Sequence, residues 1–237
     1  MKARELIDSG TTPDGNVLTL HREATGYVVR IGNEVLMSSR SHGSEQAMAV
    51  YGLEAALRSP RPRVLVGGLG MGFTLRAVLD VLPPRSEVVV AELFACVVDW
   101  CHGPLAALSH DALADRRVRL EVTDVQRIVR SPGDRFDAIL LDVDNGPDAL
   151  VSLGNRSIYS PGGLAALAAA LRPGGMLSVW SVSGSRTFEK ALARAGFRVE
   201  VVTLPARHNS AKGGHHTLFV GRTALPRAGA RSPQRSK

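Results

Sequence analysis

Four acidic side chains lie where predicted strands end, and each offers oxygens that accept hydrogen bonds or a proton. Glu92 closes the stretch SEVVVAEL, Asp124 closes VRLEVTD, and Asp142 and Asp144 follow the apolar run DAILL. In open α/β sheets, ligands bind outside the carboxyl ends of the strands. We therefore expect the four carboxylates to converge on one rim of the molecule.

A glycine-rich bend precedes these acids. Residues 64–80 read VLVGGLGMGFTLRAVLD, an apolar run that passes through glycines into a helical pattern. A strand, a glycine loop and a helix start together place backbone N–H groups and a positive helix end beside a ligand. The spacing fails the G-x-G-x-x-G dinucleotide pattern. It fits G-x-G-x-G at Gly68, Gly70 and Gly72, which resembles the loop of S-adenosylmethionine-dependent transferases.

Each acid has a predicted role and an alternative one. Glu92 lies 20 residues after Gly72, where a carboxylate can accept both hydroxyls of a ribose; otherwise it is an ordinary capping acid. Asp124 can accept from the exocyclic amine of adenine, and it can also cap the helix that follows. Asp142 can take a proton from an attacking amine, or it only orients its loop.

Alternating strands and helices must position these side chains. Apolar runs at 64–66, 88–91, 118–122, 138–141, 176–180, 198–203 and 217–220 alternate with helical patterns at 73–82, 94–108, 124–130, 161–171 and 185–195. This alternation indicates an α/β fold, a Rossmann-like, methyltransferase-type sheet that is mostly parallel. The last strand is predicted to be antiparallel because no clear helix precedes it.

A small antiparallel β module is predicted before that sheet, from short strands at 17–20, 27–31 and 35–37 separated by turn signals. A helix is expected over 44–58, with Ser44 as its N-cap. The predicted domains are the β module at 1–40, a nucleoside-binding catalytic domain at 41–221 and a tail at 222–237.

The net charge of +7 comes largely from this tail, RTALPRAGARSPQRSK, which has five basic and no acidic residues. Without it, 24 of the 29 basic residues remain against 22 acidic ones. A segment so rich in Pro, Ser and Ala is expected to be disordered. The remaining chain has no basic stripe interleaved with aromatic residues, which argues against a nucleic-acid partner.

Several other site classes are disfavoured. No apolar run approaches the roughly 18 residues of a membrane span, and the N-terminus lacks the apolar middle of a secretory signal, so we expect a soluble cytoplasmic protein. Cys96 and Cys101 are expected to be thiols rather than a disulfide. His215 and His216 would point to opposite sides of a strand, and we expect no metal site.

The chain resembles the spermidine synthase family, the polyamine aminopropyltransferases, over nearly all of residues 17–222. The matching pieces share the family's order and spacing: a β module ending in GNEVLMSSR, a helix, then VLVGGLGMG, VVVAEL, VTD, FDAILLDVDNGP and IYSPGGLAALAAALRPGGMLSVWS. The resemblance implies a methyltransferase-like domain behind a β module, and members usually pair as dimers.

The resemblance also implies a reaction. An amine attacks a carbon bound to the sulfonium of decarboxylated S-adenosylmethionine, the aminopropyl group is transferred, and methylthioadenosine leaves. The family's base falls on Asp142, and Asp144 matches the second Asp of the same loop by displacement. The ribose and adenine carboxylates fall on Glu92 and Asp124. Substrate-side positions fall on Glu45 and on Tyr159 of the IYS motif, so an amine acceptor and a homodimer are expected.

Departures from the family keep other functions open. Gly70 stands where the family has an Asp that helps hold the amino group of the aminopropyl chain, and Met37 stands where many members have Gln. A plain G-x-G-x-G favours a methyltransferase that uses S-adenosylmethionine. A pocket with few carboxylates for the amine would also fit a catalytically inactive, nucleoside-binding relative. Aminopropyl transfer is the first hypothesis because the N-terminal module is present.

Overall fold

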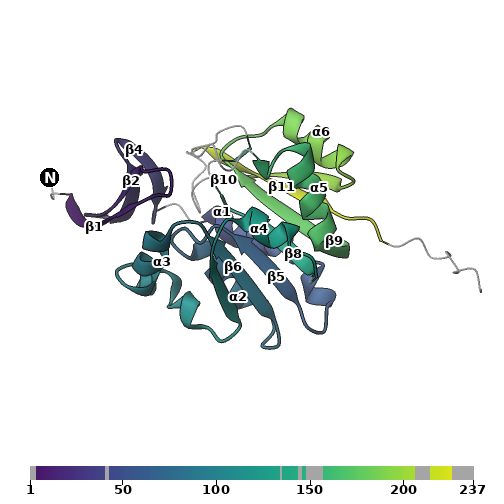
Figure 1. Ribbon diagram of the computed structural model, residues 1–237, viewed down its shortest axis with the longest axis horizontal. Helices are drawn as coiled ribbons and strands as arrows, with labels where there is room; N and C mark the ends of the chain where they lie inside the picture. The colour runs from purple at the N-terminus through teal and green to yellow at the C-terminus, as the bar shows by residue number, and fades with distance from the viewer. Residues whose placement is uncertain are drawn as a thin grey trace, which may run out of the picture.

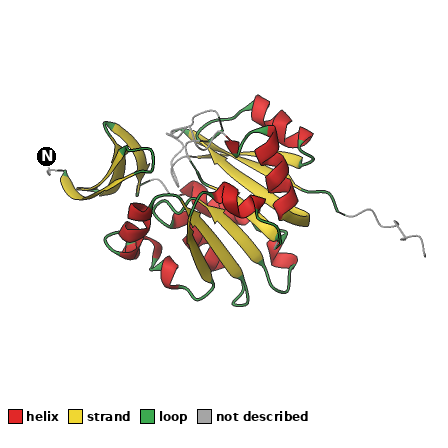
Figure 2. Ribbon diagram, viewed as in Figure 1, coloured by secondary structure: helices red, strands yellow, loops and turns green. Residues whose placement is uncertain are grey.

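A computed structural model describes residues 4–40, 43–133, 135–143, 146–147, 157–205 and 214–225. Within these ranges the chain forms a four-stranded sheet and a seven-stranded sheet. Figures 1 and 2 show the small sheet at one end of the molecule and helices on both sides of the large one. None of the helices in these ranges combines the length and apolar character needed to cross a membrane.

The small sheet is antiparallel throughout, with the order β1-β2-β3-β4. Its strands are β1 (Glu5–Thr11), β2 (Val17–Glu23), β3 (Gly26–Ile31) and β4 (Glu34–Ser38). The three predicted strands are confirmed, but β1 escaped prediction because most of its residues are exposed and show no apolar alternation. The indole Nε1 of Trp100 donates to Asp8 Oδ2 at 2.7 Å and ties β1 to the rest of the chain.

The large sheet has the order β10-β11-β9-β8-β5-β6-β7. Its strands are β5 (Arg63–Gly67), β6 (Glu87–Glu92), β7 (Val118–Val122), β8 (Phe136–Leu141), β9 (Leu171–Ser181), β10 (Arg198–Pro205) and β11 (His215–Arg222). β5 to β9 pair in parallel, and β11 pairs antiparallel with both β9 and β10. The predicted fold class, including the antiparallel last strand, is confirmed.

Helices cover both faces of this sheet (Figure 2). They are α1 (Gly43–Gly52), α2 (Phe73–Val81), α3 (Ala95–His102), α4 (Val125–Arg130), α5 (Pro161–Ala170) and α6 (Arg186–Arg194). One buried cluster joins the first three helices and the small sheet to one face, and a second joins the last three to the other. Successive strand residues divide between the two clusters, as with Val64 and Leu65, because side chains alternate across a strand.

Two predicted helices are shorter than expected. The helix predicted over 44–58 ends at Gly52, and a separate 3-10 turn spans Ala56–Arg58. The helix predicted over 94–108 ends at His102, since Pro104 has no N–H to continue the hydrogen-bond ladder. Ser44 was predicted to be the N-cap of this helix, but α1 already begins at Gly43, so Ser44 lies within the helix. The predicted domain boundaries stay a prediction, and most of the predicted tail, residues 226–237, lies outside the described ranges.

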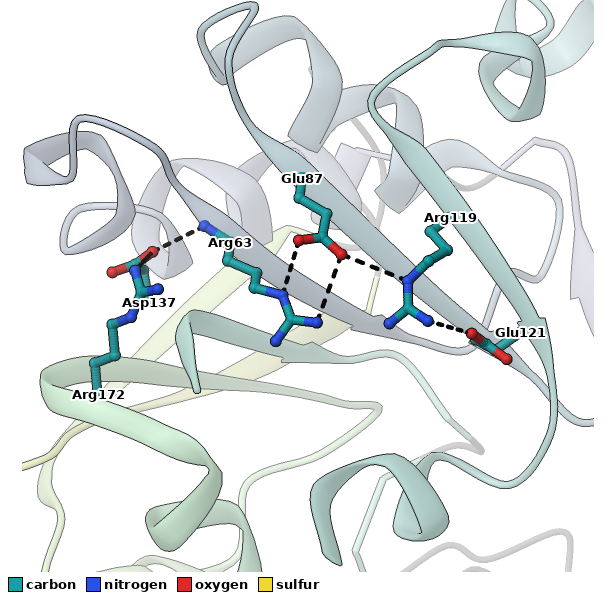
Figure 3. A network of polar contacts seen from close by, with 6 residues as sticks. All are labelled: Arg63, Glu87, Arg119, Glu121, Asp137 and Arg172. Atoms are coloured by element: carbon teal, nitrogen blue, oxygen red, sulfur yellow. Dashed lines mark hydrogen bonds and ion pairs between the residues drawn. The ribbon is translucent and has the colours of Figure 1, made fainter. Parts of the chain in front are cut away.

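Charged side chains join the strands at their amino ends (Figure 3). Asp137 Oδ2 accepts from the backbone N–H of Arg63 at 2.8 Å and from Arg172 Nη1 at 2.7 Å. The Arg63 Nε donates to Glu87 at 2.9 Å, and Glu87 also faces Arg119 at 3.4 Å. Arg119 in turn pairs with Glu121. The network therefore crosses β9, β8, β5, β6 and β7 and fixes them side by side.

Candidate functional site

The bend after β5 has the conformation that its glycines predict. Gly68, Gly70 and Gly72 have φ of 87°, 53° and 83°, in the left-handed region where residues with a Cβ are strained. A Cβ on Gly68 would lie 2.3 Å from the carbonyl oxygen of Asp142. The loop is therefore pressed against the end of β8. Gly68 and Gly70 line the cleft described below, whereas Gly72 is not among its lining residues and packs against Ser109.

Glu92 ends β6 directly below this loop. Its Oε2 accepts from the Leu69 N–H at 2.9 Å, and its Oε1 accepts from the Phe94 N–H at 2.9 Å. The side chain is buried, and burial raises the pKa of Glu92 although these backbone donors oppose the shift. The carboxylate is thus held in a fixed orientation by the glycine loop itself.

Asp124 serves as the N-cap of α4, as one of its two predicted roles required. Its Oδ1 accepts from the Gln126 N–H at 2.8 Å, and its Oδ2 accepts from Gln126 Nε2 at 3.2 Å. Asp124 also lines the cleft, beside Thr123 and Val125. Capping fixes the carboxylate at the cleft wall, so the two predicted roles are compatible.

Asp142 and Glu45 form a pair of carboxyl groups in the cleft. The Thr74 hydroxyl donates to Asp142 Oδ2 at 2.8 Å, and the Ser44 hydroxyl donates to Glu45 Oε2 at 2.9 Å. Burial raises the pKa of Asp142. Burial first, and then the negative charge of Asp142, raise the pKa of Glu45 to about 8. The negative charge of each group thus disfavours ionisation of the other, so the two carboxyl groups titrate as a pair.

These side chains face one cleft with a volume of about 430 Å³, within the range of small-molecule sites. The small sheet forms one wall, and the carboxyl ends of the large sheet's strands form the other. Among the described residues, the lining has no Lys or Arg and carries the carboxyl groups of Asp14, Glu45, Glu92, Asp124 and Asp142. A cleft lined by one sign of charge concentrates ions of the opposite sign. The cleft therefore favours a cationic ligand.

Several lining residues had no predicted role in binding. Thr12, Asp14 and Asn16 come from the turn between β1 and β2, whose sequence TTPDGN carries only a turn signal. Trp180 lines the cleft and contacts His216, with ring centroids 4.7 Å apart in an edge-to-face arrangement. No local pattern distinguishes these positions, because they reach the cleft only through tertiary packing.

One predicted site residue, Tyr159, does not line the cleft, and another lies outside the described residues. The Tyr159 ring packs edge-to-face on Phe188, its hydroxyl donates to the Val143 carbonyl at 3.3 Å, and it is not among the lining residues. This position does not support the substrate-side role expected of Tyr159. Asp144 lies outside the described residues. Within the described ranges, no cluster of His, Cys, Asp or Glu could hold a metal ion, and Cys96 and Cys101 are free thiols.

No model of a protein family matches the chain, but curated proteins do. A polyamine aminopropyltransferase of Nitrosomonas europaea is 27% identical over 179 residues, which cover 76% of this chain and 53% of the relative. One of Korarchaeum cryptofilum is 27% identical over 156 residues, covering 65% of this chain and 48% of the relative. The chain thus spans about half the length of these curated relatives.

Solved structures share the fold at low sequence identity. Spermidine synthase from Thermotoga maritima matches with a TM-score of 0.70 at 16% identity, over 93% of this chain and 74% of that one. A spermidine synthase in complex with the transition state analogue AdoDATO gives 0.68 at 16% identity, over 93% and 73%. A probable spermidine synthase from Corynebacterium glutamicum gives 0.61 at 18%, over 94% and 81%. The chain is thus similar in sequence to polyamine aminopropyltransferases, and it shares its fold with spermidine synthases.

Proposed function

We propose that the chain transfers an aminopropyl group from decarboxylated S-adenosylmethionine to an amine acceptor. One observation carries the proposal. In a chain similar to this family, the carboxyl groups of Asp124, Glu92 and Asp142 line one cleft and lie at the carboxyl ends of β7, β6 and β8, strands that lie in the order β7-β6-β5-β8. The described lining adds the carboxyl groups of Asp14 and Glu45 and contains no Lys or Arg. A donor and an acceptor that both carry positive charge suit this lining.

The nucleoside half of the donor is assigned to Glu92 and Asp124. Backbone N–H groups hold both oxygens of Glu92, and the carboxylate is assigned as the acceptor for the ribose hydroxyls. Asp124 likewise keeps acceptor capacity for the exocyclic amine of adenine after bonding Gln126. The donor's sulfonium end would then extend from the glycine loop toward Asp142.

Asp142 is assigned as the base. The acceptor's ammonium loses a proton, its nitrogen forms a bond to the carbon beside sulfur, the C–S bond breaks, and sulfur keeps the electron pair as methylthioadenosine leaves. The positive sulfur is already a good leaving group, so deprotonation and alignment are the main tasks. Glu45 lies close enough to influence the charge of Asp142 and pairs with the incoming ammonium. Asp144 follows in the same loop and is assigned as a second carboxylate for the amine.

Charge favours the decarboxylated donor. S-adenosylmethionine carries an additional carboxylate, and the described lining has no Lys or Arg that could pair with it. A carboxylate that enters a partly buried, acid-rich cleft without a cationic partner is costly. The decarboxylated donor replaces that group with hydrogen and so avoids this cost.

Methyl transfer from S-adenosylmethionine is the second candidate. Gly70 stands where relatives in the family carry an Asp for the donor's amino group, and a Cβ there would lie 3.3 Å from Met37 Sδ. The wall beside Gly70 is thus apolar at the point where the aminopropyl ammonium would need a carboxylate. The third candidate is a nucleoside-binding relative without catalysis.

One assay separates the three candidates. The purified chain is incubated with each sulfonium donor and a panel of primary amines, and the nucleoside products are identified. Methylthioadenosine formed from the decarboxylated donor alone supports aminopropyl transfer. S-adenosylhomocysteine formed from S-adenosylmethionine supports methyl transfer. Neither product, with nucleoside binding retained in calorimetry, would contradict both enzymatic proposals and support the third.

The homodimer expected from the family also stays a proposal. Light scattering on the 237-residue chain measures the mass directly. A mass of one chain at micromolar concentration would contradict it.

A further inference from the structure

A row of hydrogen-bonded side chains leads away from the carboxyl pair. The Ser44 hydroxyl contacts Glu45 Oε2 at 2.9 Å, and His216 Nδ1 lies 3.0 Å from the same hydroxyl oxygen. Glu45 and Ser44 come from α1, whereas His216 comes from β11, 172 positions away in the chain. Three side chains that can each give and take a proton therefore stand in contact, beginning at the carboxyl pair.

The proposed reaction needs such a row because it releases a proton that must leave the cleft. The acceptor begins as R–NH₃⁺ and must become R–NH₂ before its nitrogen can attack. The new N–C bond leaves the product amine positively charged, while the sulfonium becomes a neutral thioether. One proton is therefore released in each turnover. Asp142 and Glu45 can receive this proton, but both side chains are partly buried and must lose the proton again before the next turnover.

Resting on the proposed function, we propose that Ser44 and His216 carry this proton from the carboxyl pair of Glu45 and Asp142 to water. The Glu45 carboxyl gives its proton to the Ser44 oxygen, and the Ser44 hydroxyl proton passes to His216 Nδ1. A hydroxyl can rotate to make either bond, so the same side chain both accepts and donates. The resulting imidazolium releases a proton to water, and the neutral ring is restored by exchange with solvent.

The surroundings of His216 suit a group that holds a proton only briefly. Burial lowers the pKa of His216, so the ring is neutral at rest and its imidazolium form gives up a proton readily. The ring is only partly buried and can exchange protons with water, and the edge of Trp180 holds its orientation. Among the described residues, the titratable groups Glu45 and Asp142 line the same cleft as His216, while Leu204 of β10 lies opposite His216 in register.

The neighbouring histidine provides a matched control. His215 is exposed, pairs in register with Pro205, and does not line the cleft. A loss of one imidazole at each position can therefore be compared on the same strand. His215→Ala is expected to leave kcat unchanged.

The test measures methylthioadenosine formation by three His216 and Ser44 variants. His216→Gln keeps a polar group that can bond Ser44 but cannot carry a proton, and His216→Ala removes the ring. We expect both to lower kcat by about 100-fold, the low end of the range for a lost proton-transfer group. Added imidazole is expected to restore turnover in His216→Ala but not in His216→Gln. Ser44→Ala should lower kcat by a similar factor, and its combination with His216→Gln should cost little more because the two act in series.

Folding and the parent activity are checked separately. Calorimetry with methylthioadenosine is expected to give the same dissociation constant for all variants, since the nucleoside half of the cleft is untouched. Full kcat in His216→Gln and Ser44→Ala, or no response of His216→Ala to imidazole, would overturn the proton path while leaving aminopropyl transfer intact. A parent chain that forms no product with any donor would overturn the proposed function and this proposal with it.

Discussion

The acidic side chains at the two ends of the large sheet have different kinds of partner. At the amino ends of the strands, each acid of the network in Figure 3 meets an arginine: Asp137 meets Arg172, and Glu87 meets Arg63 and Arg119. At the carboxyl ends, the acids of the cleft meet backbone N–H groups, hydroxyls and one another. The described cleft lining includes no arginine or lysine.

This difference separates charges that hold the fold from charges that can bind a ligand. An acid paired with arginine has its charge compensated and has little capacity left for a cation. An acid held only by neutral donors keeps its orientation and its demand for a positive partner. Buried carboxyls without cations have raised pKa values, and such perturbed groups cluster at functional sites. Ion pairs thus stabilise the sheet at the amino ends of its strands, whereas the carboxyl groups without an arginine or lysine partner lie in the cleft at the carboxyl ends.

The largest expected effect comes from removing the proposed base. Asp142→Asn keeps the size of the side chain and its bond from Thr74 but cannot take a proton. We expect kcat to fall by about 10²- to 10⁴-fold, as for the loss of a positioned base. Product formation in single-turnover assays measures it, with methylthioadenosine affinity as the control for folding. Normal turnover in this variant would remove Asp142 from the role of base.

Glu92→Gln is expected to weaken nucleoside binding rather than chemistry. The amide keeps the volume but offers one acceptor oxygen in place of two, so one ribose hydroxyl loses its charged partner. Hydrogen bonds to charged groups contribute about 1.5–3 kcal/mol, which predicts a dissociation constant raised by roughly 10- to 100-fold. Calorimetry with methylthioadenosine measures it. An unchanged constant would exclude Glu92 from the ribose site.

Asp137→Ala tests the opposite end of the sheet. The change leaves the Arg63 N–H and the Arg172 guanidinium without this acceptor, in a position where Asp137 is buried. We expect the free energy of unfolding to fall by about 1–3 kcal/mol, the cost of an unsatisfied buried donor. Chemical denaturation measures the loss. A large fall in nucleoside affinity of the folded variant would contradict the division between the two ends.

The smallest effect is expected from Arg119→Ala on the same network. Arg119 is half exposed, with 50% of its side chain accessible, and its partners Glu87 and Glu121 are also partly exposed. Exposed ion pairs contribute about 0–1 kcal/mol. The denaturation midpoint should therefore change little, and a loss as large as that of Asp137→Ala would show that the network acts as one unit.

Much of this molecule could be predicted from local patterns. Apolar runs gave the strands of the large sheet and their alternation with helices, and the acids at strand ends gave Glu92, Asp124 and Asp142. The fold was predictable and the three acids line one cleft because strand ends and glycine turns are local features, and the fold brings the carboxyl ends of the strands to one edge. Their roles in binding and catalysis stay predictions. The strand β1 was missed because most of its residues are exposed and show no apolar alternation. The helix ends at Gly52 and His102 were missed because the helical pattern of apolar residues continues past them.

The sequence by itself determined the sheet, the glycine bend and the acids beside it, since backbone conformation and side-chain periodicity act over a few residues. Only the tertiary structure decided which acid meets which partner. Glu45 lies in α1, Asp142 directly follows β8, and His216 lies in β11. These residues are far apart in the sequence, and no local pattern links them. The mutual effect of the Glu45 and Asp142 charges, the contact between Ser44 and His216, and the cleft wall that contains Asp14 all depend on how the two sheets pack together.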